Sequence, residues 1–191
     1  MKKIVLLILC FSLSFHEGFS QENRFVLRNG VGYYTDMMGW HNGPVIWLEG
    51  GCMMRTGFYL NGRLSVSTID WTMSEGMFSD YTTIALRQMA DITFSRPVKL
   101  NGRHFLEPAF GFKLKREYHL LPDAYYEDVS GQTYLFTSYS YVFYEIGFTL
   151  CLDYYYEFKS NFFMGFRADS NIIWAVGFEG LTLSPLFGFR F

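Results

Sequence analysis

The chain has 191 residues, enough for one domain with a sizeable core. Aromatic residues make up 20% of it and charged residues only 18%, with a formal net charge of -2. This composition is too apolar for a disordered chain, and it lacks the excess of basic residues that nucleic-acid binding requires.

The first 20 residues have the pattern of a secretory signal peptide. Two lysines precede an apolar run from Ile4 to Phe15, and the small residues Gly18 and Ser20 follow. We expect cleavage near Ser20, so that residues 1–20 are the signal peptide and residues 21–191 the mature domain. A membrane anchor is the alternative, but the run is shorter than the ~20 residues that a spanning helix needs.

Cleavage would change both the charge and the cysteine content. It removes Lys2, Lys3 and Glu17 and leaves 14 basic and 17 acidic groups, so no nucleic-acid partner is expected. Cys52 and Cys151 remain in a compartment that permits disulfides. The strand pattern below puts them on opposite faces, which predicts that they do not pair.

After residue 21 the apolar residues recur at every second position, as in strands, and not at helical spacing. The clearest case is residues 141–157, YVFYEIGFTLCLDYYYE, with apolar or aromatic side chains from Val142 to Tyr156 on one face. The other face carries Glu145, Asp153 and Glu157. A strand of this length with one continuous apolar face is unusual in a water-soluble sandwich.

The same pattern predicts eight strands of alternating connection length. The predicted strands are residues 24–34, 45–55, 58–69, 82–96, 104–118, 141–157, 162–173 and 181–191. The second, fourth and sixth strands end in tight turns, and we prefer Thr56-Gly57 to Asn61-Gly62 for the first of these turns. The other connections are long, at residues 35–44, 70–80, 119–140 and 174–180. These features predict an all-β, eight-stranded antiparallel up-and-down transmembrane β-barrel.

Charge placement indicates which face meets lipid. Eight rows of large apolar side chains exceed what an eight-stranded lumen can hold, so we expect them to face lipid and the charged residues to face inward. Buried charges must pair, which predicts an ion-pair network across the lumen. Its predicted members are Arg28, Glu49, Arg55, Arg63, Arg87, Asp91, Glu107, Lys113, Glu145, Asp153, Arg167, Asp169 and Arg190.

The two ends of the predicted barrel differ in charge. The long loops contain acidic residues and no Lys or Arg, whereas the tight-turn end is mostly basic. The loop acids are Asp36, Asp70, Glu75, Asp80, Asp123, Glu127, Asp128 and Glu179. A basic rim suits an anionic phospholipid surface, and acidic loops suit water, cations or a partner.

The mature sequence resembles the small eight-stranded outer-membrane β-barrels of Gram-negative bacteria. The stretch EIGFTLCLDYYYEFKSNFFMGFRAD and the ending LFGFRF look most like those of Bacteroidota. The resemblance implies an outer-membrane location, lipid contact and assembly by the barrel-assembly machinery. That machinery would read Leu183, Phe187, Phe189 and Phe191 as an assembly signal, from which Pro185 departs. The simpler alternative is that these residues only supply the lipid-facing row of the last strand.

The lumen is predicted to be plugged. Bulky side chains at inward positions, Trp47, Met53, Tyr59 and Met89, favour a plug over the alternative of a narrow channel for small or amphiphilic solutes. We therefore expect a non-catalytic monomer with a structural or interaction role through its extracellular loops.

Catalytic and cofactor motifs are absent from the sequence, which predicts no catalytic residue, cofactor or metal. A lipid-modifying enzyme is the second alternative, with His119 and Ser138 or Ser140 as its best candidate pair. The Tyr-rich segment 119–140 is interpreted either as a binding surface for a protein partner or as an extension of two strands above the membrane.

Overall fold

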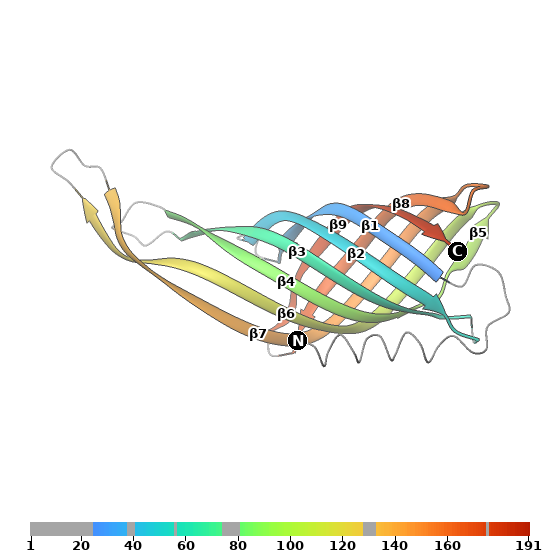
Figure 1. The fold of residues 1–191 in the computed structure, drawn as a ribbon, viewed down its shortest axis with the longest axis horizontal. Helices are drawn as coiled ribbons and strands as arrows, with labels where there is room; N and C mark the ends of the chain where they lie inside the picture. Colours follow the sequence, from blue (N-terminus) through green and yellow to red (C-terminus); the bar gives the residue numbers. More distant parts are fainter. Residues whose placement is uncertain (1–24, 38–40, 56, 74–80, 128–132, 175) are drawn as a thin grey trace.

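A computed structural model describes residues 25–191 apart from 38–40, 56, 74–80, 128–132 and 175. The predicted signal peptide lies outside the described residues. No helix in the described part of the chain is long and apolar enough to cross a bilayer. The described residues form nine strands (Figure 1): β1 (Phe25–Asp36), β2 (His41–Met53), β3 (Tyr59–Met73), β4 (Tyr81–Ser95), β5 (Val98–Asn101), β6 (His104–Glu127), β7 (Thr133–Glu157), β8 (Phe162–Ile173) and β9 (Gly177–Arg190).

Every neighbouring pair of strands is antiparallel, and the sheet closes on itself. β4 pairs with β6, while β1 pairs with both β2 and β9. The short β5 pairs only with β6, inside the connection predicted as a tight turn at residues 97–102. The predicted closed eight-stranded antiparallel barrel is therefore confirmed, with β5 as a small addition at its tight-turn end.

The first tight turn lies where the apolar alternation placed it. The amide N–H of Gly57 donates a hydrogen bond to Met54 O, with an N···O distance of 3.0 Å. Gly57 has a φ of +79°, a backbone conformation that favours glycine. Asn61 and Gly62 instead lie within β3, opposite Gly51 and Gly50. Thr56 itself lies outside the described residues.

The two faces of the sheet differ as expected for a membrane barrel. Side chains at alternate positions point outward and are apolar, including Leu64 at 67% and Phe166 at 68% exposure. Side chains between them point inward and are largely polar, including Arg28 at 1% exposure. An exposed apolar belt around a charged interior is the reverse of a soluble barrel.

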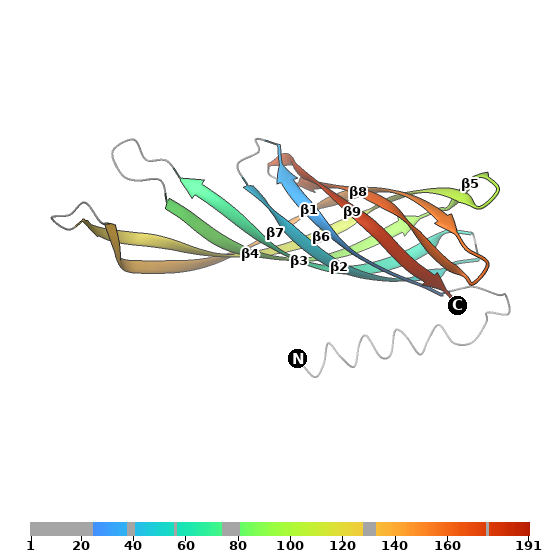
Figure 2. The same ribbon diagram turned by 90° about the horizontal axis from the view of Figure 1, so that it is seen from above.

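The loop end is uneven because one hairpin is much longer than the others. β6 continues to Glu127 and β7 begins at Thr133, and both project well beyond the other strands (Figures 1 and 2). Their backbones pair from His104–Tyr156 to Glu127–Thr133, with shifts in register on both sides of Ala124. Of the two interpretations of residues 119–140, the backbone follows the strand extension.

One seam of the barrel is interrupted. The β1–β9 pairing runs from Val26–Arg190 to Asn29–Phe187 and resumes at Tyr33–Leu183. Pro185 lies in this gap and has no N–H to donate to β1.

Candidate functional site

The barrel interior is the first candidate site, and its tight-turn end is apolar. An aromatic layer of six buried side chains fills this end, with Met53 and Phe105 packed against it. Its members are Val26, Trp47, Tyr59, Tyr155, Phe163 and Leu186. The Tyr155 and Phe163 rings lie 4.8 Å apart between centroids, and Arg190 lies 5.2 Å from both.

Trp47 links this aromatic layer to the charges beyond it. Its indole N–H donates to Ser184 Oγ at 3.0 Å, and the Arg167 guanidinium lies 4.2 Å from its ring. A Cβ on Gly30 would come within 2.6 Å of the Trp47 ring. The ring therefore needs glycine at position 30.

Beyond the aromatic layer lies a first charge cluster of two guanidinium groups and three carboxylates. Arg167 makes two 2.7 Å bonds to Asp153 and bonds of 2.9 and 3.0 Å to Glu49. Arg28 bridges Glu49 at 2.7 Å and Glu107 at 2.5 Å. The five side chains come from β1, β2, β6, β7 and β8, so the cluster ties strands across the lumen.

A second charge cluster occupies the middle of the barrel. Arg63 contacts Asp91 at 2.7 Å and Asp169 at 2.6 Å. Lys113 lies 3.5 Å from Asp91 and also bonds Asn171. Two cations and two carboxylates balance each other here, as burial requires.

A third charge cluster lies at the loop end. Arg87 contacts Glu117 and, at 3.0 Å, Glu179. Lys115 lies 3.3 Å from Glu117 and contacts both Glu145 and Glu179. Anions outnumber cations in this set, and His119 adds a ring nitrogen 3.0 Å from Glu117.

The structure places all but one of the predicted lumen charges inside the barrel. Glu145 is half-buried, and Arg190 contacts Glu157 and Tyr155 at the tight-turn end. Arg55 is exposed, so its predicted place in the lumen is wrong. It follows the end of β2 at Met53, where the inward and outward alternation no longer applies.

Several interior residues were missed from the sequence. Glu179 was assigned to a loop, but β9 begins at Gly177 and its carboxylate contacts Arg87 and Lys115. Glu117 lies within the predicted strand 104–118 and has the same inward parity as Lys113, so the alternation could have identified it. Tyr155 and Phe163 occupy inward positions where the alternation assigned polar residues, so these two members of the aromatic layer were missed, whereas Trp47 and Tyr59 had been predicted to point inward.

The candidate catalytic pair does not converge. His119 is buried on the inner face beside Glu117, whereas Ser140 is exposed on the strand β7 and pairs with Leu120. The side chain of Ser138 is not among those that the structure describes. Among the described residues there is no group of three or more His, Cys, Asp or Glu that could hold a metal ion. Cys52 and Cys151 form no disulfide, as predicted.

The four C-terminal residues of the predicted assembly signal share the outer face of the barrel. Leu183, Phe187, Phe189 and Phe191 are all exposed to the surroundings of the barrel. Their position suits lipid contact, and their recognition during assembly stays a prediction.

Comparison with solved structures finds the same barrel in several bacterial proteins. Ail, the attachment invasion locus protein of Yersinia pestis, in complex with the heparin analogue sucrose octasulfate, has a TM-score of 0.55 at 10% identity, over 90% of this chain and 100% of that one. Neisserial surface protein A has a TM-score of 0.54 at 11% identity, over 87% and 96%.

The outer membrane protein OprG from Pseudomonas aeruginosa has a TM-score of 0.56 at 9% identity, over 90% and 97%. No family model and no curated protein sequence matches the chain. The chain therefore has the fold of Gram-negative outer-membrane β-barrels, and the finer resemblance to Bacteroidota stays a prediction.

Proposed function

We propose that this outer-membrane barrel is a closed, non-catalytic monomer that acts through its projecting β6–β7 hairpin on a protein partner. The observation that carries the proposal is the length of this hairpin, which extends beyond every other described strand (Figure 1). A paired ribbon held clear of the barrel offers a preorganised surface at low entropic cost.

The charge of the hairpin favours a cationic partner surface. Residues 119–140 contain Asp123, Glu127 and Asp128 and no Lys or Arg. Opposite charge across an interface steers association and disfavours wrong partners. A polyanion such as the sucrose octasulfate in the Ail structure would meet repulsion at this hairpin, so we expect it to bind weakly here.

A closed lumen is supported by the packing of the interior. The six side chains of the aromatic layer are at most 3% exposed, and three ion-pair clusters follow them along the axis. We expect no steady unitary current from the folded protein in planar bilayers. Steady currents from wild type would favour the channel alternative, and Arg167→Gln is the variant expected to introduce leak.

The hairpin is tested by shortening it. Residues 121–139 are replaced with Asn-Gly, which suits a tight hairpin turn, between Leu120 and Ser140, which pair across β6 and β7. We expect the shortened barrel to fold and to lose a protein that the wild type captures by cross-linking in native membranes. A matched full-length variant, D123N/E127Q/D128N, separates charge from shape. Capture of the same protein by the shortened barrel would overturn the proposal.

The enzyme alternative is tested by mass analysis of lipids incubated with the folded barrel. We expect no lipid to change mass, because His119 and Ser140 lie on opposite faces of the sheet. A lipid of altered mass that disappears in His119→Gln would contradict a non-catalytic role.

A further inference from the structure

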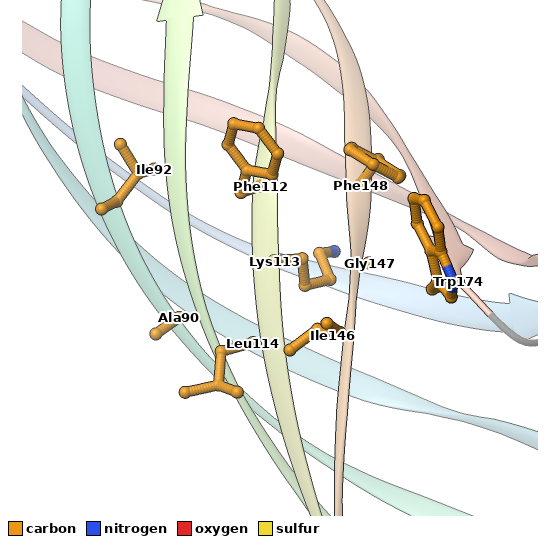
Figure 3. Close-up of a pocket in the computed structure, with 9 residues that line it drawn as sticks. All are labelled: Ala90, Ile92, Phe112, Lys113, Leu114, Ile146, Gly147, Phe148 and Trp174. Carbon is orange, nitrogen blue, oxygen red and sulfur yellow. The ribbon is translucent and has the colours of Figure 1, made fainter.

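The outer face of the barrel carries a hollow that the interior site does not explain. It has a volume of about 500 Å³ and lies over β4, β6 and β7, with Trp174 at its side (Figure 3). Ala90 contributes only a methyl group to its lining, between larger neighbours. The volume falls within the roughly 300–1,000 Å³ typical of small-molecule sites.

The lining is built from two outward rows of paired residues. One row is Ile92, Phe112 and Phe148, and the other is Ala90, Leu114 and Ile146. Figure 3 shows the first row beside Trp174 and the second row displaced from it along the strands.

Trp174 is held at the side of the hollow by its backbone and its ring. Its amide donates to Ile146 O at 3.1 Å, and its ring lies 5.8 Å from the Phe148 ring between centroids. The Lys113 ammonium belongs to the interior, where it contacts Asp91.

The next outward row toward the hairpin is polar. Gln88 pairs with Arg116 across β4 and β6, and Arg116 pairs with Tyr144 across β6 and β7. Arg116 Nη1 donates to Gln88 Oε1 at 2.6 Å, which uses one of the five N–H groups of the guanidinium. Successive outward rows are about 7 Å apart along a strand, so this cation sits directly above the hollow.

We infer that this surface binds an anionic lipid of the leaflet at the loop end, with one acyl chain in the hollow and a phosphate of its head group on Arg116. Charge complementarity selects the occupant, because the guanidinium suits the oxygens of a lipid phosphate. The exposed basic residues Arg96, Lys99 and Lys159 lie at the opposite, tight-turn end. Arg116 therefore marks one site on the loop side and is not part of a uniform basic rim.

Lipid binding at this site can be measured by quenching of Trp174, which is 74% exposed beside the hollow. The folded barrel is placed in nanodiscs that contain phosphatidylglycerol or phosphatidylcholine with brominated acyl chains, which quench tryptophan. Subtracting the quenching seen in Trp174→Phe isolates the signal of this one residue from that of the other tryptophans.

We expect brominated phosphatidylglycerol to reach half-maximal quenching of Trp174 at about two- to fivefold lower mole fraction than brominated phosphatidylcholine, the preference that one exposed ion pair supplies. Arg116→Gln should abolish the preference and leave quenching by phosphatidylcholine unchanged. Arg96→Gln, at the tight-turn end, should leave the preference intact.

The hollow itself is tested by filling it. Ala90→Phe should reduce Trp174 quenching by both lipids, while Val31→Phe on the lipid-facing side of β1 should not. Heat-dependent gel mobility checks that each variant is folded. Equal quenching by the two lipids in wild type, or a preference that survives in Arg116→Gln, would overturn the inference. Unchanged quenching in a folded Ala90→Phe barrel would also overturn it.

Discussion

The aromatic layer and the first charge cluster are neighbours in the same lumen, but different forces hold them together. The aromatic layer packs through shape and apolar area, as in Phe163 against Tyr155. The charge cluster joins oppositely charged groups that must all be present, such as Arg167 between Asp153 and Glu49. Apolar packing tolerates substitutions that preserve volume, whereas a buried ion network does not tolerate the loss of one member.

The largest expected effect is at Arg167. Arg167→Met leaves Asp153 and Glu49 buried without their main cation, and we expect a loss of about 3–5 kcal/mol in the free energy of unfolding. Urea titration of the barrel in detergent micelles measures it. Arg96→Met, an exposed control, should change stability little. A triple variant, R167M/D153N/E49Q, should recover part of the loss because it also removes the stranded charges. A loss below about 1 kcal/mol for Arg167→Met would contradict the required network.

A smaller effect is expected at Glu179, because the third charge cluster lies nearer the loop end. Glu179→Gln removes the carboxylate that contacts Arg87 and Lys115, while Glu117 still contacts both. We expect a loss of about 1–3 kcal/mol in the same urea titration. Glu179→Asp is the conservative comparison, and a wild-type stability for Glu179→Gln would place Glu179 outside the network.

We expect the aromatic layer to tolerate substitutions better than the first charge cluster does. Phe163→Leu keeps an apolar side chain at a position that is 0% exposed, so we expect a loss below about 1.5 kcal/mol. Phe163→Ala instead leaves a cavity and should cost about 3–5 kcal/mol. If both substitutions had the same cost, side-chain volume would not be what stabilises this layer.

The smallest effect on stability is expected at Phe191, the last residue of the chain. Phe191→Ala removes an exposed side chain and should leave the unfolding of the refolded barrel nearly unchanged. In cells it should reduce the amount of assembled barrel, measured by heat-dependent gel mobility of outer membranes. Phe25→Ala, also exposed at the tight-turn end, is the matched control. An equal loss for both variants would indicate lipid contact alone.

The sequence predicted the barrel well because alternation is a local property. β8 has the predicted bounds, residues 162–173, and β4 differs from its prediction by one residue at each end. Parity alone also put Arg28, Asp91 and Arg167 inside. The prediction for Arg55 was wrong because the alternation of inward and outward side chains does not continue beyond the end of a strand.

The interior contacts could not be predicted in the same way. Which cation meets which carboxylate depends on the stagger of strands around the cylinder, as with Arg28 and Glu107, which are 79 residues apart. The outward polar pair Gln88–Arg116 was missed, because the sequence does not give the register between the neighbouring strands β4 and β6. The sequence therefore predicted which charged side chains face the lumen, but not which of them contact each other.

The interrupted β1–β9 pairing has a mechanical consequence. Strands separate most readily where the pairing between them is interrupted. We therefore expect local opening to begin between Val31 and Pro185, and not between β6 and β7, whose pairing is continuous in the barrel wall. Amide protons of β1 near Gly32 should therefore exchange with deuterium sooner than those of β6 near Phe112. The first and last strands, which no hairpin turn connects, would thus also be the two that separate first.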